Sequence, residues 1–87
     1  MNQSILFNDD AIWQESEQCV RFTAQAMGAL ILCRISRHQI QSLVGDELTR
    51  PADLIDAFTC HRFEIEEMAE RKLEAQEFAE DGTIYIY

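Results

Sequence analysis

Residues 19–35 read CVRFTAQAMGALILCRI, and this stretch decides the fold. Its first half alternates apolar and polar side chains, which is the period of a strand with one buried face. Its second half is a run of aliphatic and β-branched residues, which favours a second strand. Met27-Gly28 lies between the halves as a turn, so the sequence predicts a β-hairpin.

The register of this hairpin has two solutions. A two-residue Met27-Gly28 loop pairs Arg21 with Arg34, but it requires a positive φ at Met27, which is unfavourable for methionine. A three-residue loop ending at Gly28 avoids that strain and shifts the pairing by one residue. In both registers large apolar residues share a face with Arg21 and Thr23, so we expect something to cover that face.

Two further strands are predicted at the ends of the chain. Residues 4–7, SILF, read as a short strand and are followed by a turn cluster, whereas residues 11–18 look irregular, with Trp13 as a hydrophobic plug. Residues 83–87 alternate after an Asp-Gly turn, so we expect a terminal strand whose two isoleucines face the core. If that strand lies at the sheet edge, its backbone could pair with another chain.

Helix signals fill the region between the hairpin and the last strand. Ser36 and Gln39 have the spacing of a capping box, and Gly45 is placed to end a short helix. From Pro51 no helix breaker follows until about residue 78, which predicts one helix of about 28 residues, roughly 42 Å long. A globule of this size has a diameter of about 30 Å, so that helix must kink, end early or project.

These elements predict an α+β fold in the order β-β-β-α-α-β. We expect an antiparallel or mixed sheet of about four strands, with one short and one long helix packed on one face. Residues 1–87 are short enough to form a single domain.

The chain is acidic, with a formal net charge of −9. Residues 46–87 hold twelve acids against four basic residues and account for −8 of it. This charge opposes binding to nucleic acid or to an anionic membrane, and it favours a basic or neutral protein partner. The long helix, the acidic face and the terminal strand favour a protein partner or a homodimer. The simplest interpretation is a charged, solvated face.

The compartment is predicted from what the sequence lacks. The first ten residues do not have the pattern of a signal peptide, and the longest apolar run, residues 29–33, is too short to span a bilayer. The three cysteines form no C-x-x-C pair, which fits reduced thiols. We therefore expect a cytoplasmic protein.

One face of the long helix is the first candidate site. Glu66, Glu70 and Glu74 recur every four residues with Glu67 beside them, and Phe63 lies among these acids. A phenylalanine exposed amid carboxylates would suit a protein-interaction surface. A distortion of the helix that buries the ring is the alternative.

A second candidate set comprises Arg21, Arg34, His61 and Arg62, as contacts for a small ligand. His61 falls on the apolar stripe, where a histidine is either packed or acts as a base. Arg62 is spaced to pair with Glu66 rather than to hold a substrate anion.

Metal and cofactor sites have weak support. The residue types that bind zinc are present at Cys33, His38, Cys60 and His61. The only close pair is Cys60-His61, and adjacent side chains on a helix point about 100° apart, so these two cannot easily share one ion. No metal, cofactor or catalytic residue is therefore predicted.

Three segments resemble a known family. They are VRFTA at 20–24, CRIS at 33–36, and the helical positions Ala57, Phe58, His61, Arg62, Ile65, Glu66, Ala69 and Lys72. They are similar to a family of short bacterial proteins catalogued as the domain of unknown function numbered fourteen eighty-eight. The resemblance covers about residues 4–86. It implies a compact α+β fold and a cytoplasmic bacterial protein, and it implies no activity or site residue.

The function predicted from the sequence is a non-enzymatic interaction or regulatory module that self-associates. A small-molecule binder or minor enzyme using His61 and Arg62 is one alternative. A transcription-related regulator is another, although the chain lacks a helix-turn-helix and a basic face.

Overall fold

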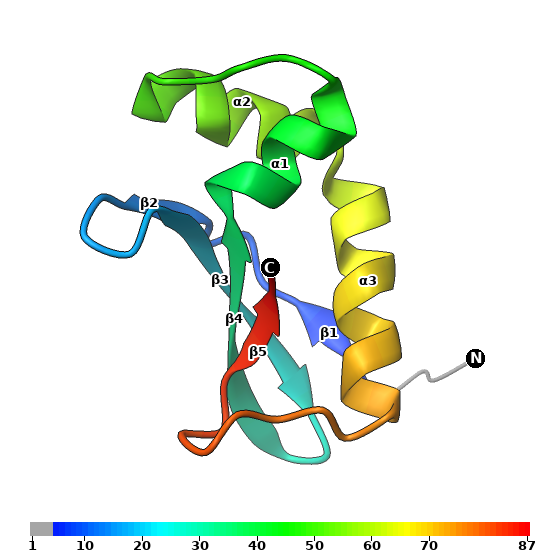
Figure 1. Cartoon of the computed structure of the whole chain (residues 1–87). Coiled ribbons are helices and arrows are strands. Elements are labelled where there is room, and N and C mark those ends of the chain that lie inside the picture. The colour runs from blue at the N-terminus through cyan, green and yellow to red at the C-terminus, as the bar shows by residue number, and fades with distance from the viewer. Residues whose placement is uncertain (1–4) are drawn as a thin grey trace.

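Strands from both ends of the chain form one mixed sheet, and helices cover one of its faces (Figure 1). The computed structural model describes residues 5–87. Its elements are β1 (Leu6–Phe7), β2 (Ile12–Gln14), β3 (Cys19–Ala26), β4 (Ala29–Ser36), α1 (Arg37–Val44), α2 (Pro51–Cys60), α3 (Arg62–Glu74) and β5 (Ile84–Ile86). The strand order is β1-β3-β4-β5, with β2 also paired to β3. The predicted α+β class is confirmed.

The β3–β4 hairpin adopts the two-residue register. Ala26 pairs with Ala29, and Arg21 therefore pairs with Arg34. Met27 has φ 53° and Gly28 has φ 75°, so both central residues take the left-handed conformation that this tight turn requires. The long strand pairing on both sides of the turn outweighs the strain at one methionine.

The interpretation of residues 11–18 as irregular was wrong in part, because β2 lies within them. Trp13 pairs with Val20 of β3 and packs against the core, as expected for the hydrophobic plug. A three-residue strand whose two large apolar side chains, Ile12 and Trp13, are adjacent has no alternation to be recognised in the sequence. In the first predicted strand, residue 4 lies outside the described residues, and the strand itself is Leu6–Phe7.

The terminal strand β5 forms as predicted and lies at the sheet edge beside β4. It runs parallel to β4, with Tyr85 next to Arg34. Ile84 and Ile86 are both buried, so the predicted face of this strand is confirmed.

Helix α1 has the predicted ends. The Ser36 side chain accepts a hydrogen bond from the Gln39 backbone N–H at 3.1 Å, and Gly45 ends the helix at φ 76°. The reciprocal half of the capping box does not form, because the Gln39 amide lies 3.9 Å from the sulfur of Met68 instead.

Of the outcomes left open for the long helix, kinking and an early end are observed: the chain forms α2 and α3, so residues 5–87 contain three helices where one short and one long helix were predicted. The helix breaks at His61, whose φ of −108° and ψ of 19° are not helical, and α3 ends at Glu74. Phe58 before the break and Ile65 after it are both buried in the core. A straight helix of 42 Å would exceed the longest dimension of the domain, 35 Å.

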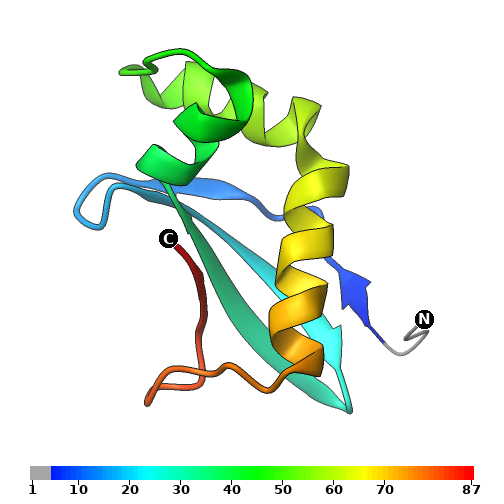
Figure 2. The ribbon, with the colours of Figure 1, turned by 45° about the vertical axis from the view of Figure 1, so that its right-hand side comes forward.

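All three helices bury their apolar residues against the same sheet face, here called the inner face (Figure 2). At its centre the Phe22 ring lies 6.2 Å from that of Phe7 and 5.1 Å from that of Phe58, between ring centroids. The alternate residues of β3 and β4 form the opposite, outer face. In the described part of the chain no helix packs on it. The Thr23 hydroxyl accepts a hydrogen bond from Asn8 and donates one to Asp10, so the segment between β1 and β2 supplies part of the expected cover.

Candidate interaction surfaces

A groove of about 460 Å³ lies between β1 and the first half of α3. We call it the acidic groove. Its residues are Ile5, Leu6 and Phe7 on the strand side and Arg62, Phe63, Glu66, Glu67 and Glu70 on the helix side. Four of the five predicted interaction residues therefore line one groove; Glu74 is exposed further along α3.

Phe63 is exposed over 78% of its surface, the largest value among the exposed large apolar residues of the described chain. The break at His61 lies just before it but does not turn the ring inward. The buried face of α3 consists of Ile65, Ala69 and Leu73, and Phe63 lies on the other side of the helix. Of the two possibilities open at the sequence level, the exposed aromatic ring is the one observed.

Arg62 links α3 to the segment that follows β1 through three hydrogen-bonding partners. Its guanidinium bonds the carboxylate of Glu66 at 2.6 Å, that of Asp9 at 2.8 Å and the carbonyl of Asn8 at 2.9 Å. The hydrogen bond to Glu66 raises the pKa of Arg62, which therefore stays charged. These contacts hold α3 against the segment between β1 and β2, and they occupy the side chain that the sequence offered as a ligand contact.

His61 lies at the junction of α2 and α3, where its Nδ1 is 3.1 Å from a carboxylate oxygen of Glu64. Its side chain is 28% exposed, so it is neither sealed in the core nor placed in the acidic groove. Within residues 5–87 no three His, Cys, Asp or Glu side chains cluster with the geometry of a metal site. The zinc-type residues considered from the sequence are dispersed: Cys33 is buried and Cys60 is exposed.

The outer face carries a row of four side chains across neighbouring strands, which we call the arginine row. The pairings Ile12 with Arg21, Arg21 with Arg34, and Arg34 with Tyr85 place them side by side. Neither arginine forms an ion pair within the described residues. The Nε atoms of both are buried and have no hydrogen-bond partner there.

Tyr85 positions one of these arginines. The Arg34 Nη1 donates to the Tyr85 hydroxyl at 3.2 Å, and the guanidinium carbon lies 5.9 Å from the ring centroid. Burial disfavours the charge on Arg34, but the hydrogen bond with Tyr85 and neighbouring groups outweigh it, so the pKa is raised. Arg34 is therefore a fixed positive charge.

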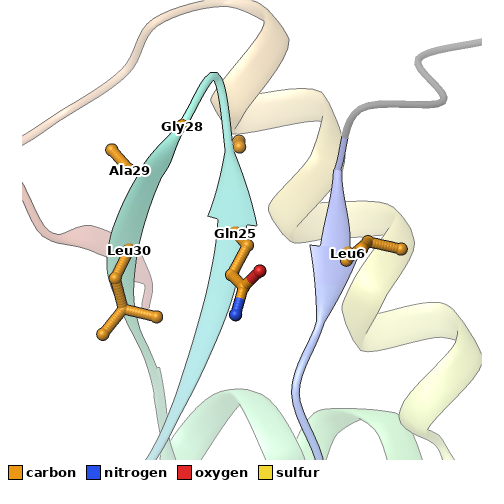
Figure 3. Close-up of a pocket in the computed structure, with 6 residues that line it drawn as sticks. Leu6, Gln25, Gly28, Ala29 and Leu30 are labelled. Atoms are coloured by element: carbon orange, nitrogen blue, oxygen red, sulfur yellow. The ribbon is translucent and has the colours of Figure 1, made fainter.

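Towards the hairpin tip the outer face becomes apolar. A shallow depression of about 450 Å³ is lined there by Leu6, Gln25 and Leu30, with Ala26, Gly28 and Ala29 (Figure 3). The two leucines are 64% and 67% exposed. In Figure 3 Gln25 and Leu30 project from the strands while the helices lie behind them. The partly apolar outer face predicted from the sequence is thus observed.

The four predicted ligand contacts do not form one site. Arg21 and Arg34 lie on the outer face, whereas His61 and Arg62 belong to the helical layer on the inner face. The sequence did not identify Leu6 and Phe7 as walls of the acidic groove. The alternation of apolar residues in the terminal strand marked Tyr85 as outward-facing, but only its parallel pairing with β4 places it beside Arg34.

The helices give one further negative result. Within residues 5–87 none combines the length and the apolar character needed to cross a bilayer.

Comparison with known proteins gives consistent matches over the whole chain. Residues 5–86 match the model of the family described as protein of unknown function DUF1488. Proteins called uncharacterized protein YrdB from Escherichia coli strain K12 and from Shigella flexneri are 32% and 31% identical, each over 99% of both chains. A crystal structure of a DUF1488 protein of unknown function from Shewanella loihica is 32% identical, with a TM-score of 0.92 over 99% of this chain and 94% of that one. The chain therefore belongs to the DUF1488 family.

Proposed function

We propose that this chain is a non-enzymatic protein-interaction module that docks a basic, partly apolar surface of a partner in the acidic groove, and that it self-associates. The exposure of Phe63 carries the proposal. This ring is 78% exposed beside the carboxylates of Glu67 and Glu70. Aromatic side chains are enriched in the buried cores of protein interfaces, where their large apolar area leaves water.

The groove specifies the chemistry of its partner. Leu6 and Phe7 line one side with apolar surface, and α3 supplies carboxylates on the other. The Glu66 charge is already matched by Arg62, whereas Glu67 and Glu70 take part in no ion pair of the described residues. A partner that places arginine or lysine next to an apolar side chain matches both sides of the groove.

A titration of isotopically labelled protein with two short amidated peptides tests this proposal. One peptide alternates arginine and leucine, and the other alternates glutamate and leucine. We expect the basic peptide to shift the backbone amide resonances of Phe7, Phe63 and Glu67 in a saturable, salt-sensitive manner. The acidic peptide should leave them unchanged.

A matched pair of phenylalanine variants serves as the control. Phe63→Ser should weaken binding of the basic peptide by at least about tenfold, the equivalent of 1.4 kcal/mol. Phe78→Ser changes a partly exposed ring outside the groove and should have no effect on affinity. Equal binding of both peptides, or equal binding to both variants, would overturn the proposal.

A further inference from the structure

The domain carries two separate surfaces of opposite charge. The arginine row lies on the outer face of the sheet, and the acidic groove lies along α3, which packs on the inner face. Each surface also has apolar neighbours: Ile12 is 44% exposed in the row, and Phe63 lies in the groove. The surfaces are therefore complementary in both charge and polarity.

The arginine row has no ion-pair partner among residues 5–87. Like charges placed directly opposite each other on neighbouring strands destabilise a sheet. Arg21 and Arg34 are so placed although the sequence holds sixteen acids, and none of those in the described residues pairs with them. A buried hydrogen-bond donor without an acceptor also lowers the stability of the folded state. The Nε atoms of Arg21 and Arg34 are both buried donors without an acceptor in the described residues.

A carboxylate placed beside this row would remove both the like-charge repulsion and the lack of acceptors for the Nε donors. It would neutralise the repulsion between the two guanidiniums and, after a small rotation of either side chain, accept hydrogen bonds from its Nε and Nη atoms in the fork geometry that arginine favours. Acidic side chains on a partner are thus the chemistry that this surface recognises. Glu67 and Glu70 are such side chains, and they border exposed Phe63.

We propose that copies of this chain associate head to tail, with Arg21 and Arg34 of one copy meeting Glu67 and Glu70 in the acidic groove of the next. The inference rests on the proposed function and names the source of the basic surface that the groove takes. Phe63 of one copy then packs against the apolar part of the arginine row of its neighbour, which is Ile12.

Symmetric pairings fit the charges less well. A contact between two outer faces that overlaps the arginine rows brings arginine against arginine, and a contact between two acidic grooves brings glutamate against glutamate. Like charges brought together across an interface cost several kcal/mol. A head-to-tail contact avoids this, and it leaves one row and one groove unfilled at its ends, so copies form rings or short filaments. The remaining negative charge of each copy is screened beyond about 8 Å at physiological ionic strength.

Two complementary variants test the contact by sedimentation velocity from micromolar to millimolar concentration. The sheet variant combines Arg21→Gln with Arg34→Gln and retains the acidic groove. The helix variant combines Glu67→Lys with Glu70→Lys and retains the arginine row. Wild type should form concentration-dependent oligomers, and each variant alone should associate at least about tenfold more weakly. An equimolar mixture of the variants should form a dimer and nothing larger, because only one contact can form.

Matched controls keep the change in net charge the same. Arg50→Gln with Arg71→Gln removes two arginines outside both surfaces, and Glu47→Lys with Glu80→Lys reverses two exposed acids elsewhere. Both controls should associate like wild type. A wild type that is monomeric at every concentration, a mixture that stays monomeric, or controls that fail like the variants would each overturn the head-to-tail contact. The peptide titration at a concentration where the protein is monomeric reports separately on the groove, so the two proposals can fail independently.

Discussion

Arg21 and Arg34 lie directly opposite each other on β3 and β4, and neither has a carboxylate partner among residues 5–87. The surrounding strands hold two like charges side by side on a face that no helix of the described residues covers. Cross-strand charge pairs change sheet stability by roughly 0.2–1 kcal/mol, with a sign set by the charges. The pair is therefore a local weakness of the isolated chain, which the proposed contact would convert into a binding site.

Replacing one arginine should therefore stabilise the isolated domain. We expect Arg21→Gln to raise the free energy of unfolding by about 0.5 kcal/mol and Arg21→Glu, which pairs with Arg34, by up to about 1 kcal/mol. Urea unfolding at low salt and low protein concentration measures both. Added salt should reduce the differences from wild type, since it screens the repulsion. A loss of stability in both variants would show that the arginines do not repel each other as described.

Truncation of the two phenylalanines near the helix break should change the free energy of unfolding by very different amounts. Phe58 is 3% exposed and packs on Phe22, so Phe58→Ala should cost about 3–5 kcal/mol. Phe63→Ala removes an exposed ring and should change the free energy of unfolding by less than about 0.5 kcal/mol. Denaturant unfolding of both variants provides the comparison. Similar losses at the two positions would contradict the assignment of Phe63 to the surface.

A substitution at Met27 that suits a positive φ should stabilise the hairpin turn. Its φ of 53° is strained for methionine, whereas asparagine accepts this conformation and Asn-Gly is favoured in such turns. Met27→Asn should therefore stabilise the domain by about 0.5–1 kcal/mol, measured by thermal or urea unfolding. Gly28→Ala is the opposite control. No atom lies within 4 Å of a Cβ added there, so its loss of about 1 kcal/mol would come from the positive φ alone.

The three thiols should differ in reactivity. Cys60 is exposed, whereas Cys19 and Cys33 are fully buried. Burial raises the pKa of Cys19 and raises that of Cys33 to about 12. At pH 8 a disulfide reagent that releases a coloured thiolate should modify Cys60 quickly in the native protein and the other two only after unfolding. Cys60→Ser should abolish the fast phase; a fast phase that survives this change would place another thiol at the surface.

The same burial predicts a direction for the pH dependence of stability. An unfolded thiol ionises at about pH 8.5, while the folded Cys33 thiol keeps its proton until about pH 12. The folded state therefore binds more protons between these values, and its stability falls as the pH rises through that window. Below about pH 8 Cys33 contributes no pH dependence. Cys33→Ala, compared by urea unfolding at alkaline pH, should flatten the slope; an unchanged slope would assign it to other groups.

The sequence by itself determined the features that depend on near neighbours. The alternation in residues 19–26 produces a strand with one buried face, and Ser36 and Gly45 set the ends of α1 through contacts a few residues away. The acidic stripe on α3 likewise follows from helical spacing, whereas the exposure of Phe63 was left open by the sequence and was decided by the tertiary structure. The peptide geometry enforces these periods locally, so they can be read without knowing the rest of the fold.

Only the tertiary structure decided the features that join distant residues. The helix breaks at His61 although the apolar stripe continues across it from Phe58 to Ile65, so the helical spacing of the sequence does not reveal the break. The hairpin register follows from the whole length of strand pairing and overrides the preference of Met27. The acidic groove and the arginine row both depend on strand order: β1 is placed beside α3, and β5 runs parallel to β4. Contacts between residues far apart in the sequence determine the helix break, the hairpin register and the strand order. Only these contacts bring the predicted residues together into the acidic groove and the arginine row.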